Sequence, residues 1–201
     1  MTTVLILYPK LFNCYSKFSR KVLKITSTLS ATKLVYPSDP NGLIAKLCFE
    51  NSEKMTAMDV VSWHPNDITH AIIFDDGEEF IEETAQLKES GKPLRVISIS
   101  ITRVVNIKTE TDYQSEISTA NYEYIGRGSY WGNPYSMYED GDDREEVIRK
   151  YKYDFDYEKF PNKEKSNVYK LAGKRLGCFC KPLACHGDVL ADFLNSWDDG
   201  K

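Results

Sequence analysis

Residues 70–101 constrain the fold most, because their apolar pattern changes from strand to helix and back to strand. The apolar run at 70–74 predicts a buried strand, and residues 78–89 have helical spacing that ends at Gly91. A second apolar run at 94–101 predicts another strand. A helix that connects two strands over this length implies parallel pairing with a right-handed crossover. The segment therefore predicts an α/β fold with a parallel sheet.

The preceding residues extend this pattern toward the N-terminus. Apolar runs at 3–7 and 33–36 predict two more buried strands, and 16–29 has the spacing of an amphipathic helix. Asn41-Gly42 leads into a weaker helical pattern that extends through 57–63. We therefore expect residues 1–108 to form a Rossmann-like, mostly parallel sheet with flanking helices. This half resembles the Rossmann-like nucleotide-binding domains of the lysine-decarboxylase-like superfamily.

The carboxyl ends of these strands are the expected ligand-binding edge, as in other open parallel sheets. Here the ends fall after Leu7, after Tyr36 and at Asp75-Asp76. We expect the carboxylates of Asp75 and Asp76 to hold ribose hydroxyls. Neither GxGxxG nor GxxxxGK[ST] occurs in the sequence, so no dinucleotide or P-loop motif supports a more specific assignment.

A second, smaller α/β unit is expected at residues 121–201, after a polar linker or loop at 109–120. Within it, residues 144–151 begin a helical pattern, and a further helix is expected near 167–172. Residues 175–180 form a short run typical of a strand, which the following Lys-Pro dipeptide ends.

The composition limits where the protein works and what it contacts. A chain of 201 residues with 41% hydrophobic and 28% charged residues is typical of a soluble globular protein. The opening apolar run is too short for a membrane span and lacks the pattern of a signal peptide, so we expect no membrane contact and a cytoplasmic location. Five cysteines, an odd number, fit a reducing compartment. The net charge of −4 argues against a general nucleic-acid coat, and a homo-oligomer stays open.

Residues 124–134, YIGRGSYWGNP, form a glycine-rich stretch typical of a loop whose N–H groups converge on an anion. Arg127 could contact a phosphate through its planar guanidinium, and Trp131 or Tyr130 could stack on a base. Alternatively, the glycines only build a tight connection and Trp131 fills the core. The candidate ligand-binding residues are Gly126, Arg127, Gly128, Ser129, Trp131 and Asn133, together with Lys174.

The turn CFCKPLACHGD precedes a predicted C-terminal helix, because apolar residues recur at helical spacing after Gly187. Cys185, His186 and Asp188 are therefore expected at a helix N-terminus, where free N–H groups and the helix dipole favour a thiolate. Cys185 would be a nucleophile whose pKa this position lowers toward neutrality, with help from His186 or Lys174. The candidate catalytic residues are Cys185, His186 and Asp188.

Two other interpretations of the same cysteines stay open. Cys178, Cys180, Cys185 and His186 could bind zinc, although the adjacent Cys185 and His186 are poorly spaced for a closed structural site. Alternatively, Cys178 and Cys180 are small apolar strand residues, and Cys185 packs beneath the helix. The leading expectation includes no metal or other cofactor, and zinc is the alternative.

Three segments together resemble one known family. YIGRGSYWGNP (124–134), DREEVIRKY (143–151) and GKRLGCFCKPLACHGDVLADFL (173–194), in that order, resemble the family named domain of unknown function 4326, which is common in phages and bacteria. The resemblance implies that the WGNP loop and the CFCKPLACHGD turn belong to one site. It implies no particular reaction.

These patterns lead to three functional hypotheses. The first is an enzyme that acts on a nucleotide, nucleoside or nucleotide-sugar, as a hydrolase or transferase at an N-glycosidic bond or in making a modified base. The second is a non-catalytic sensor or sponge that binds a nucleotide derivative. The third is a zinc-stabilised adaptor that binds a protein or nucleic acid through the basic residues between 144 and 181. In the first two, the expected partner is a small nucleotide-like molecule.

Overall fold

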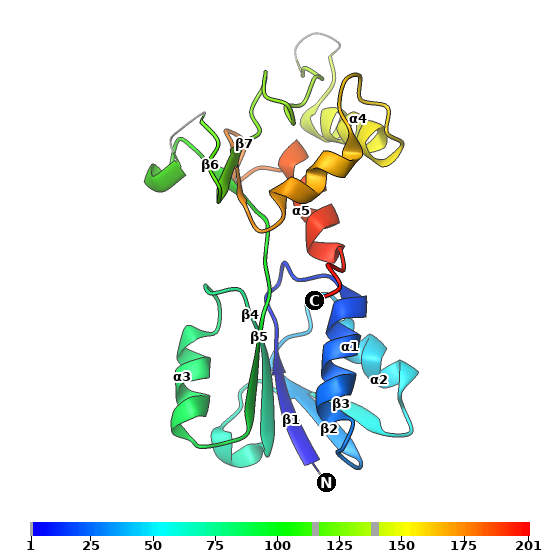
Figure 1. The fold of residues 1–201 in the computed structure, drawn as a ribbon, viewed down its shortest axis with the longest axis vertical. Helices are drawn as coiled ribbons and strands as arrows, with labels where there is room; N and C mark the ends of the chain where they lie inside the picture. The colour runs from blue at the N-terminus through cyan, green and yellow to red at the C-terminus, as the bar shows by residue number, and fades with distance from the viewer. Residues whose placement is uncertain (1, 114–116, 138–140) are drawn as a thin grey trace. The chain divides into compact units, whose positions relative to one another are not determined.

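The protein folds as two compact units (Figure 1). A computed structural model describes residues 2–113, 117–137 and 141–201. Unit 1 comprises Met1–Ile99 and Ser196–Lys201, and unit 2 comprises Ser100–Asn195. The last residues of the chain therefore belong to the same unit as its first residues.

The division between the units falls earlier than the sequence predicted. We expected residues 1–108 in the first unit, whereas the structure assigns Ser100 and the following residues to unit 2. The reason is that residues 103–106 form a strand that pairs with residues 175–178, so backbone hydrogen bonds hold this segment in the second unit. Residues 114–116 of the expected linker lie outside the described residues.

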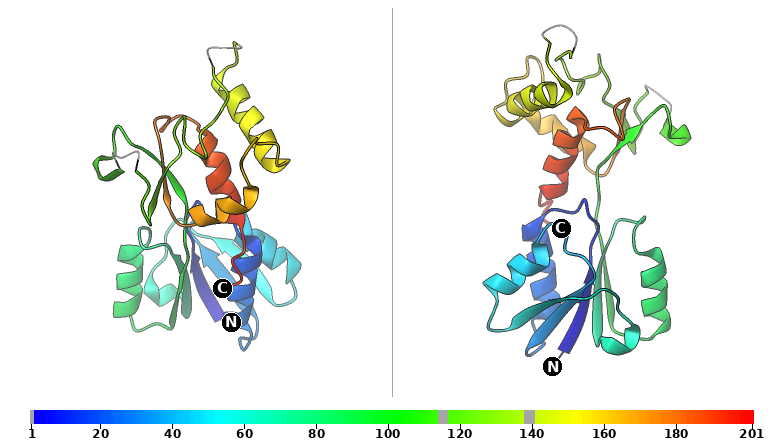
Figure 2. Two further views of the ribbon diagram at one scale, coloured as in Figure 1. Left: turned by 45° about the horizontal axis from the view of Figure 1, so that its top comes forward. Right: turned by 180° about the vertical axis from the view of Figure 1, so that it is seen from behind.

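Unit 1 is built on a five-stranded parallel sheet with the strand order β3-β2-β1-β4-β5. Helices α1 and α2 cover one face of this sheet and α3 covers the other (Figure 1, Figure 2). The elements are β1 (Thr2–Leu7), α1 (Tyr15–Thr26), β2 (Thr32–Tyr36), α2 (Leu43–Glu50), β3 (Met55–Asp59), η1 (Pro65–Asp67), β4 (His70–Asp75), α3 (Ile81–Glu89) and β5 (Leu94–Ser98). The expected α/β fold with a Rossmann-like parallel sheet is confirmed.

The two central strands, β1 and β4, explain why the sequence located this sheet well. Leu5 and Ile6 in β1 and Ile72 and Ile73 in β4 are all buried. Helices cover both faces of a parallel sheet, so its central strands must be apolar on both sides. An unbroken apolar run in the sequence is the direct result.

The edge strand β3 corrects one prediction. Residues 57–63 were expected to have a helical pattern, but Met55–Asp59 forms a strand that pairs in parallel with β2. The helix lies earlier, at Leu43–Glu50. Only Met55 of β3 is buried and the other four residues are exposed, so the strand lacks the apolar pattern that would have identified it.

Aromatic side chains fill part of the edge where β1 and β4 end. The rings of Phe12 and Phe18 each stack on Phe74, with centroids 5.1 Å apart in both pairs. Tyr8 packs edge-on against Phe12 and Phe18, and its hydroxyl donates a hydrogen bond to Asp39 at 2.5 Å. These packed aromatic side chains thus occupy part of the sheet edge where the sequence predicted a ligand.

The C-terminal residues pair with helix α1 inside unit 1. Lys17 Nζ donates to both carboxylate oxygens of Asp199, at 2.9 and 3.0 Å. Arg20 contacts Asp198 at 2.8 Å. Lys17 is only 7% exposed, so its ammonium depends on Asp199 as a counter-charge.

Unit 2 contains a smaller sheet of three parallel strands in the order β6-β8-β7. The elements are β6 (Arg103–Asn106), η2 (Thr111–Tyr113), β7 (Tyr122–Tyr124), α4 (Arg144–Asp156), η3 (Lys165–Leu171), β8 (Arg175–Cys178) and α5 (His186–Ser196). The expected strand and C-terminal helix are confirmed as β8 and α5. Strands β6 and β7 were missed because each has only four or three residues.

The core of unit 2 lies around helix α5. Leu190 and Leu194 of α5 are buried in one cluster with Tyr151 and Phe155 of α4 and Leu176 of β8. This cluster fixes the start of α5 and the end of β8, the two places where the cysteines lie. No helix among the described residues is long and apolar enough to cross a membrane.

Gly177, in the central strand β8, generates a stability prediction. A Cβ atom at this position would overlap the ring of Tyr122 from β7. We expect Gly177→Ala to lower the free energy of unfolding by about 1–3 kcal/mol, the usual cost of overpacking a core. Chemical denaturation followed by circular dichroism measures this loss. Tyr122→Leu removes the overlapping atoms, so Gly177→Ala should cost clearly less in that background, and an equal cost in both backgrounds contradicts the assigned contact.

Candidate functional site

The site lies where the three parallel strands of unit 2 end. Ile125, which follows β7, donates its N–H to Gly177 O at 2.9 Å, and Ile107, which follows β6, donates to Cys178 O at 3.1 Å. Asn106 Nδ2 donates to Lys181 O at 2.5 Å. Parallel strands end at one edge of a sheet, so the glycine loop after β7 and the cysteine turn after β8 lie side by side.

A pocket of about 180 Å³ opens at this edge. Most of its lining comes from the glycine loop, the start of α4 and the cysteine turn, which are the three segments of the family resemblance, and Tyr135 and Met137 lie just after the glycine loop. The lining residues are Gly126, Arg127, Asn133, Tyr135, Met137, Arg144, Val147, Ile148, Cys178, Phe179, Cys180, Ala184, Cys185 and His186. The prediction that the three segments converge on one place is confirmed.

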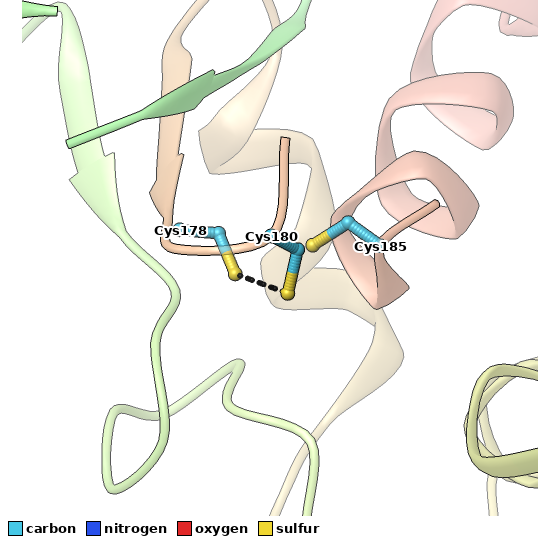
Figure 3. A group of neighbouring side chains, drawn as sticks. All are labelled: Cys178, Cys180 and Cys185. Carbon is cyan, nitrogen blue, oxygen red and sulfur yellow. Dashed lines mark hydrogen bonds between the residues drawn. The ribbon is translucent and has the colours of Figure 1, made fainter. Parts of the chain in front are cut away.

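Three cysteine thiols meet in the wall of this pocket (Figure 3). Cys178 ends β8, Cys180 lies in the following turn, and Cys185 directly precedes α5. Their sulfur atoms all lie within 4.8 Å of one another, and Cys178 Sγ donates to Cys180 Sγ at 3.4 Å. Cys180 is half-buried, whereas Cys178 and Cys185 are buried.

The order of the thiol pKa values in the cluster differs from the one that the sequence predicted. Hydrogen bonds from Cys178 and Cys185, with a contribution from Arg144, hold the pKa of the Cys180 thiol well below its usual range. Hydrogen bonding to Cys178 and Cys180, together with burial, raises the pKa of Cys185. The expected lowering of the Cys185 pKa is therefore wrong. Gly187 N–H does approach Cys185 Sγ at 3.4 Å, but the neighbouring sulfurs outweigh this helix N-terminal contact.

His186 is buried and its ring orientation is defined by one hydrogen bond. Nε2 lies 2.9 Å from Ile125 O, which can only accept, so Nε2 carries the proton. Nδ1 is then the unprotonated nitrogen, and it lies 3.6 Å from Cys185 Sγ. Burial lowers the pKa of His186, which favours the neutral ring.

Asp188 stabilises the turn. Its Oδ2 accepts a hydrogen bond from Cys185 N–H at 2.9 Å, and its Oδ1 forms an ion pair with Lys181 at 2.5 Å. A carboxylate in the first helical turn that reaches back to the preceding N–H acts as a helix cap. Asp188 is not among the pocket-lining residues, so its geometry fits a cap better than the acid or base expected from the sequence.

The glycine loop is tight for steric reasons. A Cβ on Gly126 would overlap Tyr124, and one on Gly132 would meet Gly126 O at 2.5 Å. Gly128 has a φ of +86°, in the region that favours glycine. Trp131 is buried in the core, and Tyr151 donates to its carbonyl at 2.9 Å, as the alternative interpretation of the loop expected.

Two arginines face the pocket in different states. Arg127 is exposed and forms no hydrogen bond or ion pair with any described residue. Arg144, at the start of α4, donates to Ala184 O at 3.2 Å, and it contributes to the lowered pKa of the Cys180 thiol. Arg144 was not among the residues predicted from the sequence, although it lies in the DREEVIRKY segment at a helix N-terminus.

The remaining candidate residues do not line this pocket. Lys174 pairs with Glu123 at 3.0 Å. Asp75 and Asp76 belong to unit 1, where Asp75 accepts from Gly77 N–H at 2.9 Å and Asp76 also caps its turn. Ser129 has a buried hydroxyl without a hydrogen-bond partner among the described residues. Ligand contacts by these residues stay predictions.

The fold and site define a two-unit α/β protein whose smaller unit carries a pocket lined by thiols. The chain belongs to the Minimal SLOG domain family through residues 1–105 and to the domain of unknown function DUF4326 family through residues 105–196. The family resemblance found in the sequence is thus confirmed, and the second match nearly coincides with unit 2.

A phage protein is a relative of this chain. The "Uncharacterized 12.4 kDa protein in nrdA-td intergenic region" of Enterobacteria phage T4 is 38% identical over 95 residues, which cover 46% of this chain and 77% of the relative. No solved structure matches this chain significantly. The similarity links the chain to a phage family and names no reaction.

The rates at which the thiols react test the predicted order of their pKa values. In metal-free protein with a chelator present, we expect iodoacetamide to modify Cys180 faster than the other four cysteines, because Cys180 is the most exposed and its pKa is lowered. A lowered pKa keeps the thiolate as the pH falls, so the rate should change little from about pH 8 to about pH 6, where an ordinary thiol slows about tenfold per unit.

Peptide mass spectrometry at successive times measures which cysteine is modified. The fast phase should disappear in Cys180→Ser and persist in Cys14→Ser, which alters a buried cysteine of unit 1. Modification of Cys185 first would restore the order that the sequence predicted.

Proposed function

We propose that the protein is an enzyme that acts on a nucleotide, nucleoside or nucleotide-sugar bound in the pocket of unit 2. The observation that carries this proposal is that Arg127, which has no partner among the described residues, and a cluster of three thiols line one largely apolar pocket. Apolar walls with a few converging polar groups are typical of small-molecule sites. The Minimal SLOG match covers residues 1–105, outside this pocket, and SLOG domains are a nucleotide-related group, so the match supports a nucleotide-related role for the chain as a whole.

The pocket size limits which part of a nucleotide would enter. Its volume of about 180 Å³ is smaller than the roughly 300–1,000 Å³ typical of sites that enclose a drug-sized ligand. One ring system therefore fits the pocket, with the rest of the molecule outside. Phe179, which is 43% exposed, and Tyr135 line the pocket and offer aromatic faces to a base.

Arg127 supplies the anion contact in this proposal. Its guanidinium is exposed and free of acidic partners among the described residues, so it can form a bidentate contact with a phosphate. Arg144 adds a second positive charge at the pocket wall. The pocket would bind the base and Arg127 would bind the phosphate, so the protein would contact a nucleotide at both of its ends.

In this proposal, the cysteine cluster supplies the chemically reactive groups of the pocket wall. The sequence pointed to Cys185, His186 and Asp188 as catalytic residues, but Asp188 is engaged as a helix cap and Cys185 is buried. Cys180 presents the most exposed sulfur of the cluster. Chemistry at an N-glycosidic bond or on a base is therefore proposed to take place next to the cluster.

A second candidate function is a non-catalytic sensor or sponge for a nucleotide derivative. The engagement of His186 with Ile125 O and of Asp188 with Cys185 N–H favours it, because both side chains already serve the fold. Binding without turnover needs only the pocket, Arg127 and the aromatic side chains. The same experiment separates the two candidates.

Binding of nucleoside monophosphates and of UDP-glucose, measured by calorimetry, tests the proposal. We expect Arg127→Ala to weaken binding at least about tenfold, since hydrogen bonds to charged groups contribute about 1.5–3 kcal/mol. The matched control is Arg149→Ala, because Arg149 is an exposed arginine of unit 2 that pairs with Glu146 and does not line the pocket. It should leave binding unchanged.

Chromatography of the same probes after incubation with the protein distinguishes an enzyme from a binding protein. Conversion that is lost in Cys180→Ser supports the enzyme, whereas binding without conversion supports the sensor or sponge. Absence of binding for all probes, or equal effects of Arg127→Ala and Arg149→Ala, contradicts the nucleotide site. Mass spectrometry of small molecules that copurify with the native protein identifies the ligand class independently.

A further inference from the structure

The geometry of the three thiols points to a single bound ion. Cys178, Cys180 and Cys185 direct their sulfurs toward one another, and all three sulfurs lie within 4.8 Å (Figure 3). Zinc binds thiolates at about 2.3 Å in tetrahedral sites, which places neighbouring sulfurs about 3.8 Å apart. The Cys178 and Cys180 sulfurs are already 3.4 Å apart, so small side-chain rotations would bring all three to one ion.

The surrounding contacts hold the cysteines in place before any ion binds. Cys178 is fixed by the pairing of β8 with a strand on each side. Asp188 accepts a hydrogen bond from Cys185 N–H. Asn106 anchors the turn because its side-chain amide donates a hydrogen bond to Lys181 O. A preorganised set of ligands supported by further hydrogen bonds is the arrangement that metal sites require.

We propose that Cys178, Cys180 and Cys185 bind one zinc ion as thiolates, with its fourth coordination position facing the pocket. On binding, three Zn–S bonds replace the S–H bonds that remain in the cluster, and the displaced protons go to solvent. Three thiolates and Zn²⁺ carry a net charge of −1, which Arg144 beside Cys180 offsets. All three cysteines line the pocket, so a fourth ligand could reach the ion from there.

The ligand set differs from the one that the sequence suggested. His186 does not belong to the group of mutually close ligand atoms, whereas the three cysteines do. Its Nε2–H donates a hydrogen bond to Ile125 O, and its unprotonated Nδ1 lies 3.6 Å from Cys185 Sγ. His186 therefore packs against the cluster as a neighbour. Three protein ligands with one open position are typical of catalytic zinc, and four of structural zinc.

A single ion fits better than an iron–sulfur cluster. In such a cluster the cysteine thiolates bind different iron atoms, so their sulfurs lie further apart than around one ion. Soft thiolate ligands select zinc or copper(I) among single ions. The zinc proposal stands apart from the proposed function, because metal binding is measured without any nucleotide and either can fail alone.

Metal analysis of the full chain, purified without a histidine tag and under reducing conditions, tests the proposal. We expect one zinc per chain by mass spectrometry of the metal content. After chelation, the apoprotein should take up zinc again at the same ratio. Cys180→Ser should weaken zinc affinity at least about a hundredfold, since loss of an outer-shell partner alone costs about 10- to 100-fold.

Cys14→Ser and Cys48→Ser are matched controls, because both alter buried free cysteines of unit 1 and should leave the zinc affinity unchanged. Circular dichroism establishes that each variant is folded. Equal zinc affinity of Cys180→Ser and wild type, or copper in place of zinc, overturns the proposal.

Cobalt(II) substitution of the wild-type chain gives a result that does not depend on any variant. We expect intense sulfur-to-cobalt charge-transfer absorption that zinc displaces, and ligand-field bands that shift when imidazole is added. Absence of charge-transfer absorption overturns the thiolate site. A spectrum that imidazole leaves unchanged overturns the open fourth position.

Discussion

Parallel pairing on both sides of β8 is the constraint on which the site of unit 2 depends. β8 lies between β6 and β7, and all three strands end at the same edge. The residues that follow each strand therefore meet there, although they are far apart in the sequence. Ile125 N–H bonds to Gly177 O directly beyond the end of β7 and thereby sets where the glycine loop begins. Backbone hydrogen bonding thus brings two of the segments that line the pocket, the glycine loop and the cysteine turn, next to each other.

Much of unit 1 could be predicted from the sequence, because burial leaves a strong pattern. The apolar runs of β1 and β4 and the amphipathic spacing of α1 identify a parallel sheet between helices. The edge strand β3 could not be found, since its exposed residues need not be apolar. Strands β6 and β7 are too short to show any period, and their pairing partner β8 lies far along the chain.

The site shows where local reasoning fails. The position of Cys185 before a helix was predicted, but its pKa was not, because Cys178 and Cys180 approach it from β8 and the following turn. A helix N-terminus can be read from neighbouring residues in the sequence. The close approach of sulfurs from another element cannot. Arg144 was overlooked for the same reason, since only the folded turn brings it to Cys180.

The return of residues 196–201 to unit 1 makes that unit discontinuous in the chain. Lys17, near the beginning, finds its counter-charge at Asp199, near the end. During synthesis on a ribosome, β1 and α1 emerge early, yet the ion pair that completes their surroundings forms only after all of unit 2 has been made. The smaller unit is thus inserted in the sequence of the larger one. The larger unit begins to be translated first but can be completed only after the smaller unit has been translated.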